Sequence, residues 1–110
     1  MGKDSFLGEF EQMLLLAAMR LEEEAYGVRL MEELESSVGR SVSRGSVYVT
    51  LDRLEDKGWI VSEHSAPRPE RGGRSRRVIR VTREGVRALQ KSRAALLTLW
   101  DGLEDSLDAG

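Results

Sequence analysis

The stretch SRGSVYVTLDRLEDKGWI, residues 43–60, decides the fold that the sequence predicts. Its first residue, Ser43, suits a helix N-cap because the hydroxyl can accept a hydrogen bond from a free N–H of the first turn. Apolar residues follow at spacings of four and three, so one side of the helix faces a core; they are Val47, Leu51 and Leu54. Gly58 stops the helix, and the apolar residues after it begin a strand. The stretch thus predicts a helix over about residues 43–57, followed by a strand.

The opposite side of this helix carries short polar groups and guanidiniums, which suit base edges and phosphates. The candidates for base-edge and nearby contacts are Ser43, Arg44, Ser46, Val49 and Thr50, with Arg53 further along the helix. A recognition helix in a DNA major groove requires one buried apolar side and one exposed side with basic and polar groups. An ordinary amphipathic helix with a solvated face explains the same residues and is the alternative at this point.

Length and composition favour one globular domain. The chain has 110 residues, of which 40% are hydrophobic and 33% charged. It has no cysteine, so disulfides and thiolate metal sites are excluded. The longest apolar run, Met13 to Met19, is too short to span a bilayer, and no signal peptide is visible. We therefore expect a cytoplasmic protein.

The charges are unevenly distributed, although the net charge is only −2. Residues 1–39 carry three basic and nine acidic side chains, net −6, and residues 81–110 carry four and five, net −1. Residues 40–80 carry ten basic and five acidic side chains, net +5. A basic middle between acidic flanks is the local pattern that a nucleic-acid partner would select.

Two helices are predicted before the organising helix. The first covers Glu9 to Leu21 and is apolar nearly all round, so it must be covered on several sides. The second covers Tyr26 to Val38 and ends at Gly39. Residues 40–42 form a short link, long enough for one extended bridge, and residues 1–8 are expected to be a loose arm.

A hairpin with a long basic tip is predicted after the organising helix. Its strands are Trp59 to Ser65 and Ser75 to Val81, and the tip between them contains two prolines and two glycines. Four residues of the segment 71–77, RGGRSRR, are arginine: Arg71, Arg74, Arg76 and Arg77. Arginine in such a wing can enter a minor groove or contact phosphates. A solvated loop that binds nothing is the alternative.

The last predicted helix begins after the N-cap Thr82 and runs from Arg83 to about Ser106. It carries a heptad-like apolar stripe that one small domain has no obvious place to bury. We therefore expect a homodimer in which this helix packs on its copy or on the partner's first helix. The expected interface residues are Phe10, Leu14, Leu89, Leu96, Leu99, Trp100, Leu103 and Leu107. Packing onto the chain's own core is the alternative.

Catalytic chemistry is not predicted. His64 is the only histidine, and alone it suits a surface position better than a general base or a ligand. The carboxylates fall on turns and helix faces, and no metal-ligand spacing occurs. We expect no catalytic residue, no metal and no cofactor.

The order helix, helix, short link, helix and hairpin is that of a winged helix-turn-helix. The matching stretches are LGEFEQMLLLAAMRL (7–21), EAYGVRLMEELE (24–35), SRGSVYVTLDRLEDKGWI (43–60) and RGGRSRRVIRVTREG (71–85). Together they resemble the PadR family of bacterial transcriptional regulators, and the single last helix resembles its short subgroup. The chain departs from the family at Val78 and Ile79, where aromatic residues are usual, and at Arg83, where proline is usual.

The resemblance implies a mainly α fold with a small hairpin, in which residues 1–81 form the winged helix-turn-helix and residues 82–110 the dimerisation helix. It implies a homodimer on a double-stranded DNA operator, usually a repressor released by a small molecule or another signal. By similarity, Tyr48 and Arg53 lie at the DNA side of the third helix and contact phosphates. Trp100 falls where short family members hold a tryptophan against small aromatic ligands; a plain interface residue is the alternative there.

A winged helix used as a protein-interaction module, without DNA binding, is the alternative function. The acidic residues in the second half of the third helix would support it: Asp52, Glu55 and Asp56.

Overall fold

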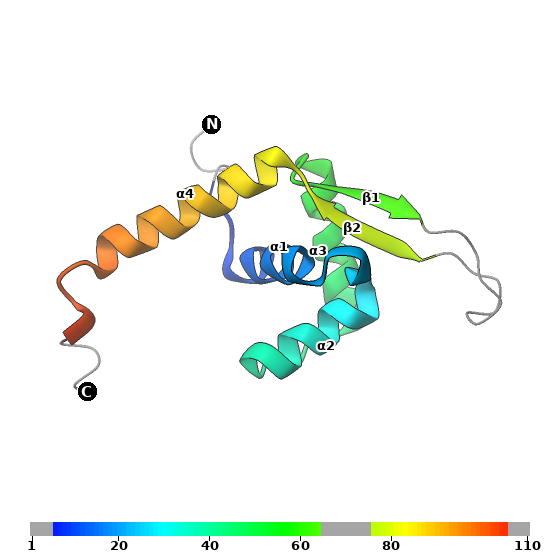
Figure 1. The fold of residues 1–110 in the computed structure, drawn as a ribbon, viewed down its shortest axis with the longest axis horizontal. Helices are drawn as coiled ribbons and strands as arrows, with labels where there is room; N and C mark the ends of the chain where they lie inside the picture. Colours follow the sequence, from blue (N-terminus) through cyan, green and yellow to red (C-terminus); the bar gives the residue numbers. More distant parts are fainter. Residues whose placement is uncertain (1–5, 65–75, 106–110) are drawn as a thin grey trace.

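The structure is a computed structural model that describes residues 6–64 and 76–105 (Figure 1). Its elements are α1 (Glu9–Leu21), the short 3-10 helix η2 (Glu22–Glu24), α2 (Gly27–Val38), α3 (Arg44–Asp56), β1 (Ile60–His64), β2 (Arg77–Val81) and α4 (Arg83–Trp100). The two strands form an antiparallel hairpin beside three packed helices. This arrangement confirms the predicted fold class, a mainly helical winged helix-turn-helix.

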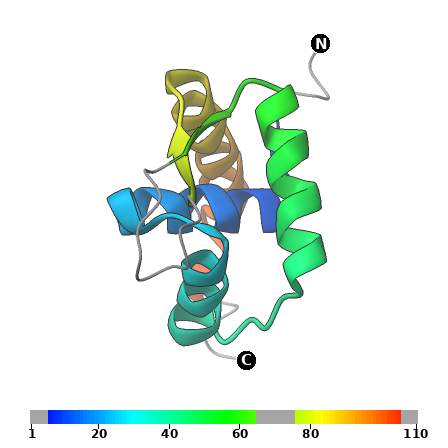
Figure 2. The ribbon, with the colours of Figure 1, turned by 90° about the vertical axis from the view of Figure 1, so that its right-hand side faces the viewer.

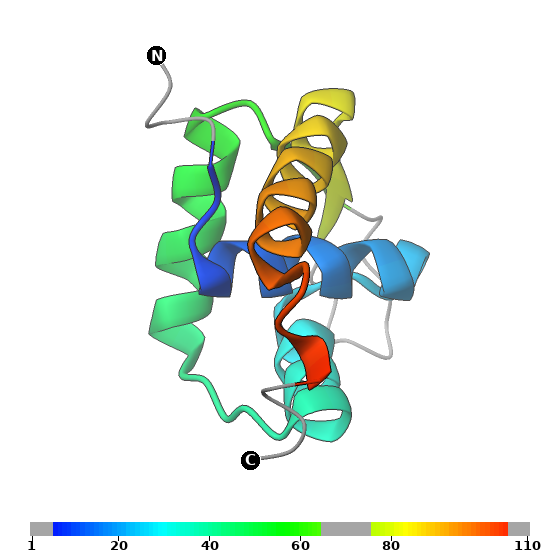
Figure 3. The same cartoon turned by 90° about the vertical axis from the view of Figure 1, so that its left-hand side faces the viewer.

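The first helix, α1, lies at the centre of the molecule. In Figures 2 and 3, α3 runs along one side of it, while the start of α4 and the hairpin lie on the other. Figure 1 shows the hairpin and α4 extending in opposite directions from this centre. The central place of α1 explains why its sequence is apolar nearly all round.

The core draws on the three packed helices and both strands. Its most completely buried side chains are Leu14, Leu15, Leu30, Val47, Leu51, Leu54, Ile60 and Ile79. The predicted apolar side of α3 is among them, so the helix packs as its spacing indicates. The Ser43 hydroxyl accepts a hydrogen bond from the Ser46 N–H at 3.1 Å, which confirms the predicted N-cap.

Helix ends mostly agree with the sequence prediction. The helix α2 begins one residue later than predicted, with Tyr26 as its N-cap, and Gly39 ends it with a positive φ of 68°. The prediction for α4 is wrong at its end, because the helix stops at Trp100 and not near Ser106, which lies outside the described residues. Asp101 leaves the helical conformation with a ψ of 126°, and Gly102 follows with a φ of 83°.

The segment before α1 is attached to the fold, so the expectation of a loose arm is wrong for residues 6–8. Leu7 is buried, and its N–H donates to the Ser92 hydroxyl at 3.1 Å. The Gly8 N–H donates to the Glu11 carboxylate at 2.8 Å. The start of the described chain is therefore fixed against α4. Residues 1–5 lie outside the described part.

The hairpin receives one further backbone hydrogen bond, but not from the predicted link. Within β1 and β2, Ile60 faces Val81 and His64 faces Arg77. The Ile79 N–H donates to the Ala25 carbonyl oxygen at 2.8 Å, so the bridging residue lies between η2 and α2. Residues 40–42, where an extended bridge was expected, belong to no strand. The small side chain of Ala25 is fully buried. A bulkier residue at this position would push the hairpin away from the Ala25 carbonyl.

The junction between the hairpin and α4 is closely packed. The Thr82 hydroxyl donates to the Gly58 carbonyl at 2.7 Å and accepts from the Gly85 N–H at 3.1 Å. The Thr82 N–H donates to the Trp59 carbonyl at 3.0 Å. A Cβ on Gly85 would clash with that same carbonyl oxygen, so only glycine lets the first turn of α4 approach so closely.

Gly85→Ala should lower the free energy of unfolding by about 1–3 kcal/mol, because the added methyl overlaps backbone that cannot yield. Gly45→Ala is the matched control. Gly45 lies in α3, and nothing stands within 4 Å of its Cβ position, so alanine should stabilise the helix by about 0.5–1 kcal/mol. Urea denaturation measures both. Equal effects of the two substitutions would contradict the close approach at Gly85.

Candidate nucleic-acid interface

The first half of α3 exposes the side opposite its buried stripe. Ser43, Arg44 and Ser46 are exposed, and the Val49 side chain is 60% exposed. The hydroxyls of Ser43 and Ser46 lie 2.9 Å apart, so the cap also fixes the Ser46 side chain. Within the described part of the chain, Arg44 forms no ion pair. This surface offers hydroxyls, a methyl-bearing side chain and an available guanidinium, which are groups that read base edges.

Thr50 does not belong to this surface, and its predicted outward position is wrong. It is only 5% exposed. Thr50 follows Val47 by three residues and precedes Leu54 by four, so it falls on the edge of the same helical stripe. The predicted buried stripe of α3 contained only Val47, Leu51 and Leu54 and therefore left out Thr50.

Tyr48 joins α3 to the start of α2. Its ring is half-buried against the core, and a Cβ on Gly27 would clash with its hydroxyl and ring. Glycine at position 27 is therefore needed for the Tyr48 ring to pack there, although the two residues are more than twenty positions apart in the sequence. Tyr48 therefore sets the spacing of the two helices, and its expected phosphate contact is a prediction that the structure leaves untested.

The C-terminal half of α3 contacts α1 through ion pairs. The Glu11 carboxylate is buried and lies 3.8 Å from both the Arg53 guanidinium and the Lys57 ammonium. The same carboxylate caps α1 through the Gly8 N–H. Arg53 keeps 53% of its side chain exposed, so it can still contact a partner.

Arg77 is bound inside the protein. Its Nε donates to the Ser62 hydroxyl at 2.8 Å, and its two terminal nitrogens pair with Glu55 at 2.9 Å and Asp52 at 3.1 Å. The Ser62 hydroxyl in turn donates to Glu55 at 2.7 Å. The Ser62 hydroxyl first, and the Arg77 guanidinium second, hold the pKa of the Glu55 carboxyl below its usual range.

The predicted wing arginines therefore separate into three groups. Arg77 is held by Ser62, Asp52 and Glu55, and its predicted DNA contact stays a prediction. Arg76 lies over the Tyr26 ring, with 4.2 Å from the guanidinium carbon to the ring centre. Arg71 and Arg74 lie outside the described residues. The network of Asp52, Glu55, Ser62 and Arg77 was missed because its members are up to 25 residues apart, and no local pattern marks them.

Comparison with known proteins decides the family. Residues 15–91 match the transcriptional regulator PadR-like family, which is more than half of the chain. The chain belongs to this family.

Two solved structures and one curated relative agree with that assignment. A PadR family transcriptional regulator from Eggerthella lenta is 29% identical, with a TM-score of 0.67 over 93% of this chain and 88% of that one. A PadR-like regulator from Bacillus cereus, 23% identical, shares the fold with a TM-score of 0.65 over 91% and 88% of the two chains. Transcriptional regulator Rv3488 of Mycobacterium tuberculosis is 45% identical over 73 residues. That match covers 66% of this chain and 64% of the relative, which is less than two thirds of its length. These relatives are transcriptional regulators.

The described part of this PadR-like chain contains no group of three or more metal-ligating side chains. His64 is exposed at the end of β1. No helix within residues 6–64 and 76–105 is long and apolar enough to cross a membrane.

The expected dimer residues fall into two classes. Leu14 is fully buried in the chain's own core and presents no surface to a second copy, while Leu89 is mostly buried and lines the groove between α1 and α4, so its predicted interface place stays a prediction. Phe10 is partly buried under Arg40. The second half of α4 remains uncovered, with Leu96, Leu99 and Trp100 exposed. Leu103, beyond the end of the helix, is exposed too, and Leu107 lies outside the described residues. An interface through α4 must therefore use its C-terminal half.

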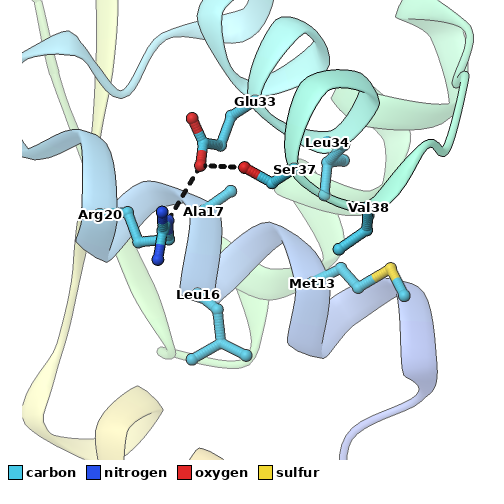
Figure 4. A pocket seen from close by; sticks show the side chains of 8 residues that line it. All are labelled: Met13, Leu16, Ala17, Arg20, Glu33, Leu34, Ser37 and Val38. Atoms are coloured by element: carbon cyan, nitrogen blue, oxygen red, sulfur yellow. Dashed lines mark hydrogen bonds and ion pairs between the residues drawn. The ribbon is translucent and has the colours of Figure 1, made fainter.

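Two apolar grooves flank Leu16 on α1. One, of about 350 Å³, lies between α1 and α4 and includes Leu97 and Trp100. The other, of about 440 Å³, lies between α1 and α2 (Figure 4). At its rim the Glu33 carboxylate accepts hydrogen bonds from Ser37 at 2.7 Å and from Arg20 at 2.9 Å. These two groups, Ser37 first, lower the pKa of Glu33.

Proposed function

We propose that this PadR-like chain binds double-stranded DNA as a homodimer and acts as a transcriptional repressor. The observation that carries the proposal is the exposed first half of α3. There two serines and Arg44, which has no ion pair among the described residues, stand opposite a fully buried stripe. Such a surface suits a helix that enters the major groove with its N-terminal residues at the base edges. The DNA partner also implies the expected cytoplasmic location.

Within this proposal, the residues of α3 divide by position. Ser43, Arg44, Ser46 and Val49 meet base edges, because they lie at the exposed start of the helix. Arg53 and the edge of Tyr48 meet phosphates further along, and Arg71, Arg74 and Arg76 meet the flanking backbone or minor groove. The acidic residues Asp52 and Glu55 do not oppose this arrangement strongly, since Arg77 pairs with both.

The dimer follows from the uneven burial of α4. Ser92 is buried at the middle of the helix, and Leu99, seven residues later on the same side, is 72% exposed. In Figure 1 the C-terminal half of α4 extends beyond α1. A second copy that covers this half removes a row of leucines from water. The twofold symmetry would present two α3 helices to successive major grooves, about 34 Å apart.

Arg44→Ala should weaken binding to the DNA upstream of the protein's own gene by about 1–3 kcal/mol per protomer and relax preference at one base position of each half-site. Arg87→Ala is the control, since Arg87 is an equally exposed arginine on α4. Titration by fluorescence anisotropy, with selection of bound fragments from the source genome, measures both effects. Absence of any binding by the parent at low salt would favour the protein-interaction module instead.

Leu99→Asp should convert the dimer to a monomer, because a carboxylate would be buried between the two copies. Val28→Asp is the control: Val28 is also an exposed apolar residue, but it lies on α2. Sedimentation velocity at micromolar concentration separates the two species. A parent protein that is monomeric, or a Leu99→Asp variant that stays dimeric, would contradict the α4 interface.

A second candidate function, release from DNA by a small hydrophobic or aromatic ligand, is favoured by the groove between α1 and α4. Trp100 lines this groove together with leucines, and a flat ligand could stack on its ring. Planar cationic dyes should then quench tryptophan fluorescence in the parent and much less in Trp100→Ala. Trp59 is buried under Lys57 and serves as the unquenched background. Equal quenching in parent and variant would exclude Trp100 from ligand binding.

A further inference from the structure

The contact between Arg77 and α3 lies at the end of the described hairpin that is nearer to residues 65–75. In the strand register, Arg77 faces His64, and these residues form the final pair before residues 65–75. At the opposite end Ile60 is buried in the core, and so is Ile79 in the middle of β2. A two-stranded hairpin has little stability of its own, so its direction depends on such attachments.

The geometry of this contact is specific. Each nitrogen of the guanidinium meets a different group: Nε the Ser62 hydroxyl, Nη1 Asp52 and Nη2 Glu55. Ser62 uses its hydroxyl twice, accepting from Arg77 and donating to Glu55. Three elements, α3, β1 and β2, are therefore joined through one planar side chain. Charged hydrogen bonds of this kind are stronger than neutral ones and require the forked shape of arginine.

Arg77 is also less exposed than an arginine that is available to bind DNA. Its side chain is 22% exposed, compared with 53% for Arg53. A DNA phosphate would have to share the guanidinium with two carboxylates and a hydroxyl, which already take three of its five N–H donors, or displace them. Displacement would leave Asp52 and Glu55 as unpaired negative charges on the helix nearest the DNA, which is unfavourable.

We infer that Arg77 is a positioning residue: it holds the hairpin at a fixed angle to α3 and neutralises Asp52 and Glu55, and it does not contact DNA itself. The inference rests on the proposed DNA-binding function and deepens it. In the proposed complex the hairpin lies beside the recognition helix, and Arg77 keeps β1 and β2 in that place. Loss of this clamp, the contact of Arg77 with Asp52, Glu55 and Ser62, therefore lowers affinity by changing how the hairpin sits on α3.

The first test replaces Arg77 by glutamine and by lysine and measures binding to the DNA upstream of the protein's own gene. Both variants should bind at least tenfold more weakly than the parent, because lysine keeps the charge but lacks the fork. A phosphate contact would tolerate lysine. The matched control is Arg80→Gln: Arg80 pairs with Glu63 within the same hairpin, at 3.1 Å, and its loss should change affinity less than threefold. Near-parental binding by Arg77→Lys would overturn the inference.

A charge exchange provides the second test. Arg77→Glu combined with Glu55→Arg reverses the pair, and the Ser62 hydroxyl can serve either orientation because it both donates and accepts. The double variant should recover binding to within about threefold of the parent, with an unchanged dependence on salt concentration. A direct phosphate contact predicts no recovery and a salt slope lower by about one for each lost contact. Failure to recover in a double variant that melts like the parent would overturn the inference.

Amide hydrogen exchange separates this inference from the proposed function. In Arg77→Gln, the amides of β1 and β2 next to the tip should exchange at least tenfold faster, whether or not DNA is present. Arg80→Gln should not accelerate exchange in α3. If the parent binds no DNA, the proposed function fails. Unchanged amide exchange in Arg77→Gln would overturn the positioning role of Arg77, whether or not the protein binds DNA.

Discussion

Burial of the apolar stripe on α3 is the constraint on which the rest of the structure depends. Val47, Leu51 and Leu54 are almost completely removed from water, at roughly 25 cal/mol per Å² of apolar surface. Rotation of the helix about its axis would expose them, so the hydrophobic effect fixes which side of α3 faces outward. The serines and Arg44 at its start are outward because of that burial. The candidate interface is thus a consequence of the core.

Two close backbone approaches keep the neighbouring elements in register with α3. Gly27 admits the Tyr48 ring to the start of α2, and Gly85 admits the first turn of α4 to the Trp59 carbonyl. In both places the partner is an aromatic residue or backbone that cannot move aside cheaply. The fold therefore depends on two residues without side chains as much as on its leucines. This dependence explains why both glycines occur inside the stretches that carry the family resemblance.

Local periodicity was enough to predict the elements, because helices and strands are set by neighbours in sequence. The bounds of α1, the N-cap at Ser43 and the hairpin were predictable on that ground. Contacts between distant residues were not. The inward position of Thr50 depends on how wide the core is, and the bridge at Ala25 depends on where the hairpin folds back. The role of Arg77 depends on carboxylates more than twenty residues away, which no spacing rule connects to it.

The same long-range pairing changes the meaning of the charge count. Residues 40–80 have a net charge of +5, yet most of their described cations lie beside carboxylates: Arg40 with Glu9, Arg53 and Lys57 with Glu11, Arg77 with Asp52 and Glu55, and Arg80 with Glu63. Such pairs attract a distant polyanion little, because their fields cancel beyond a Debye length. Arg44 differs in having no ion pair within the described part of the chain. Arg44 therefore offers its charge at the start of α3, where the hydroxyls that could read a sequence also lie.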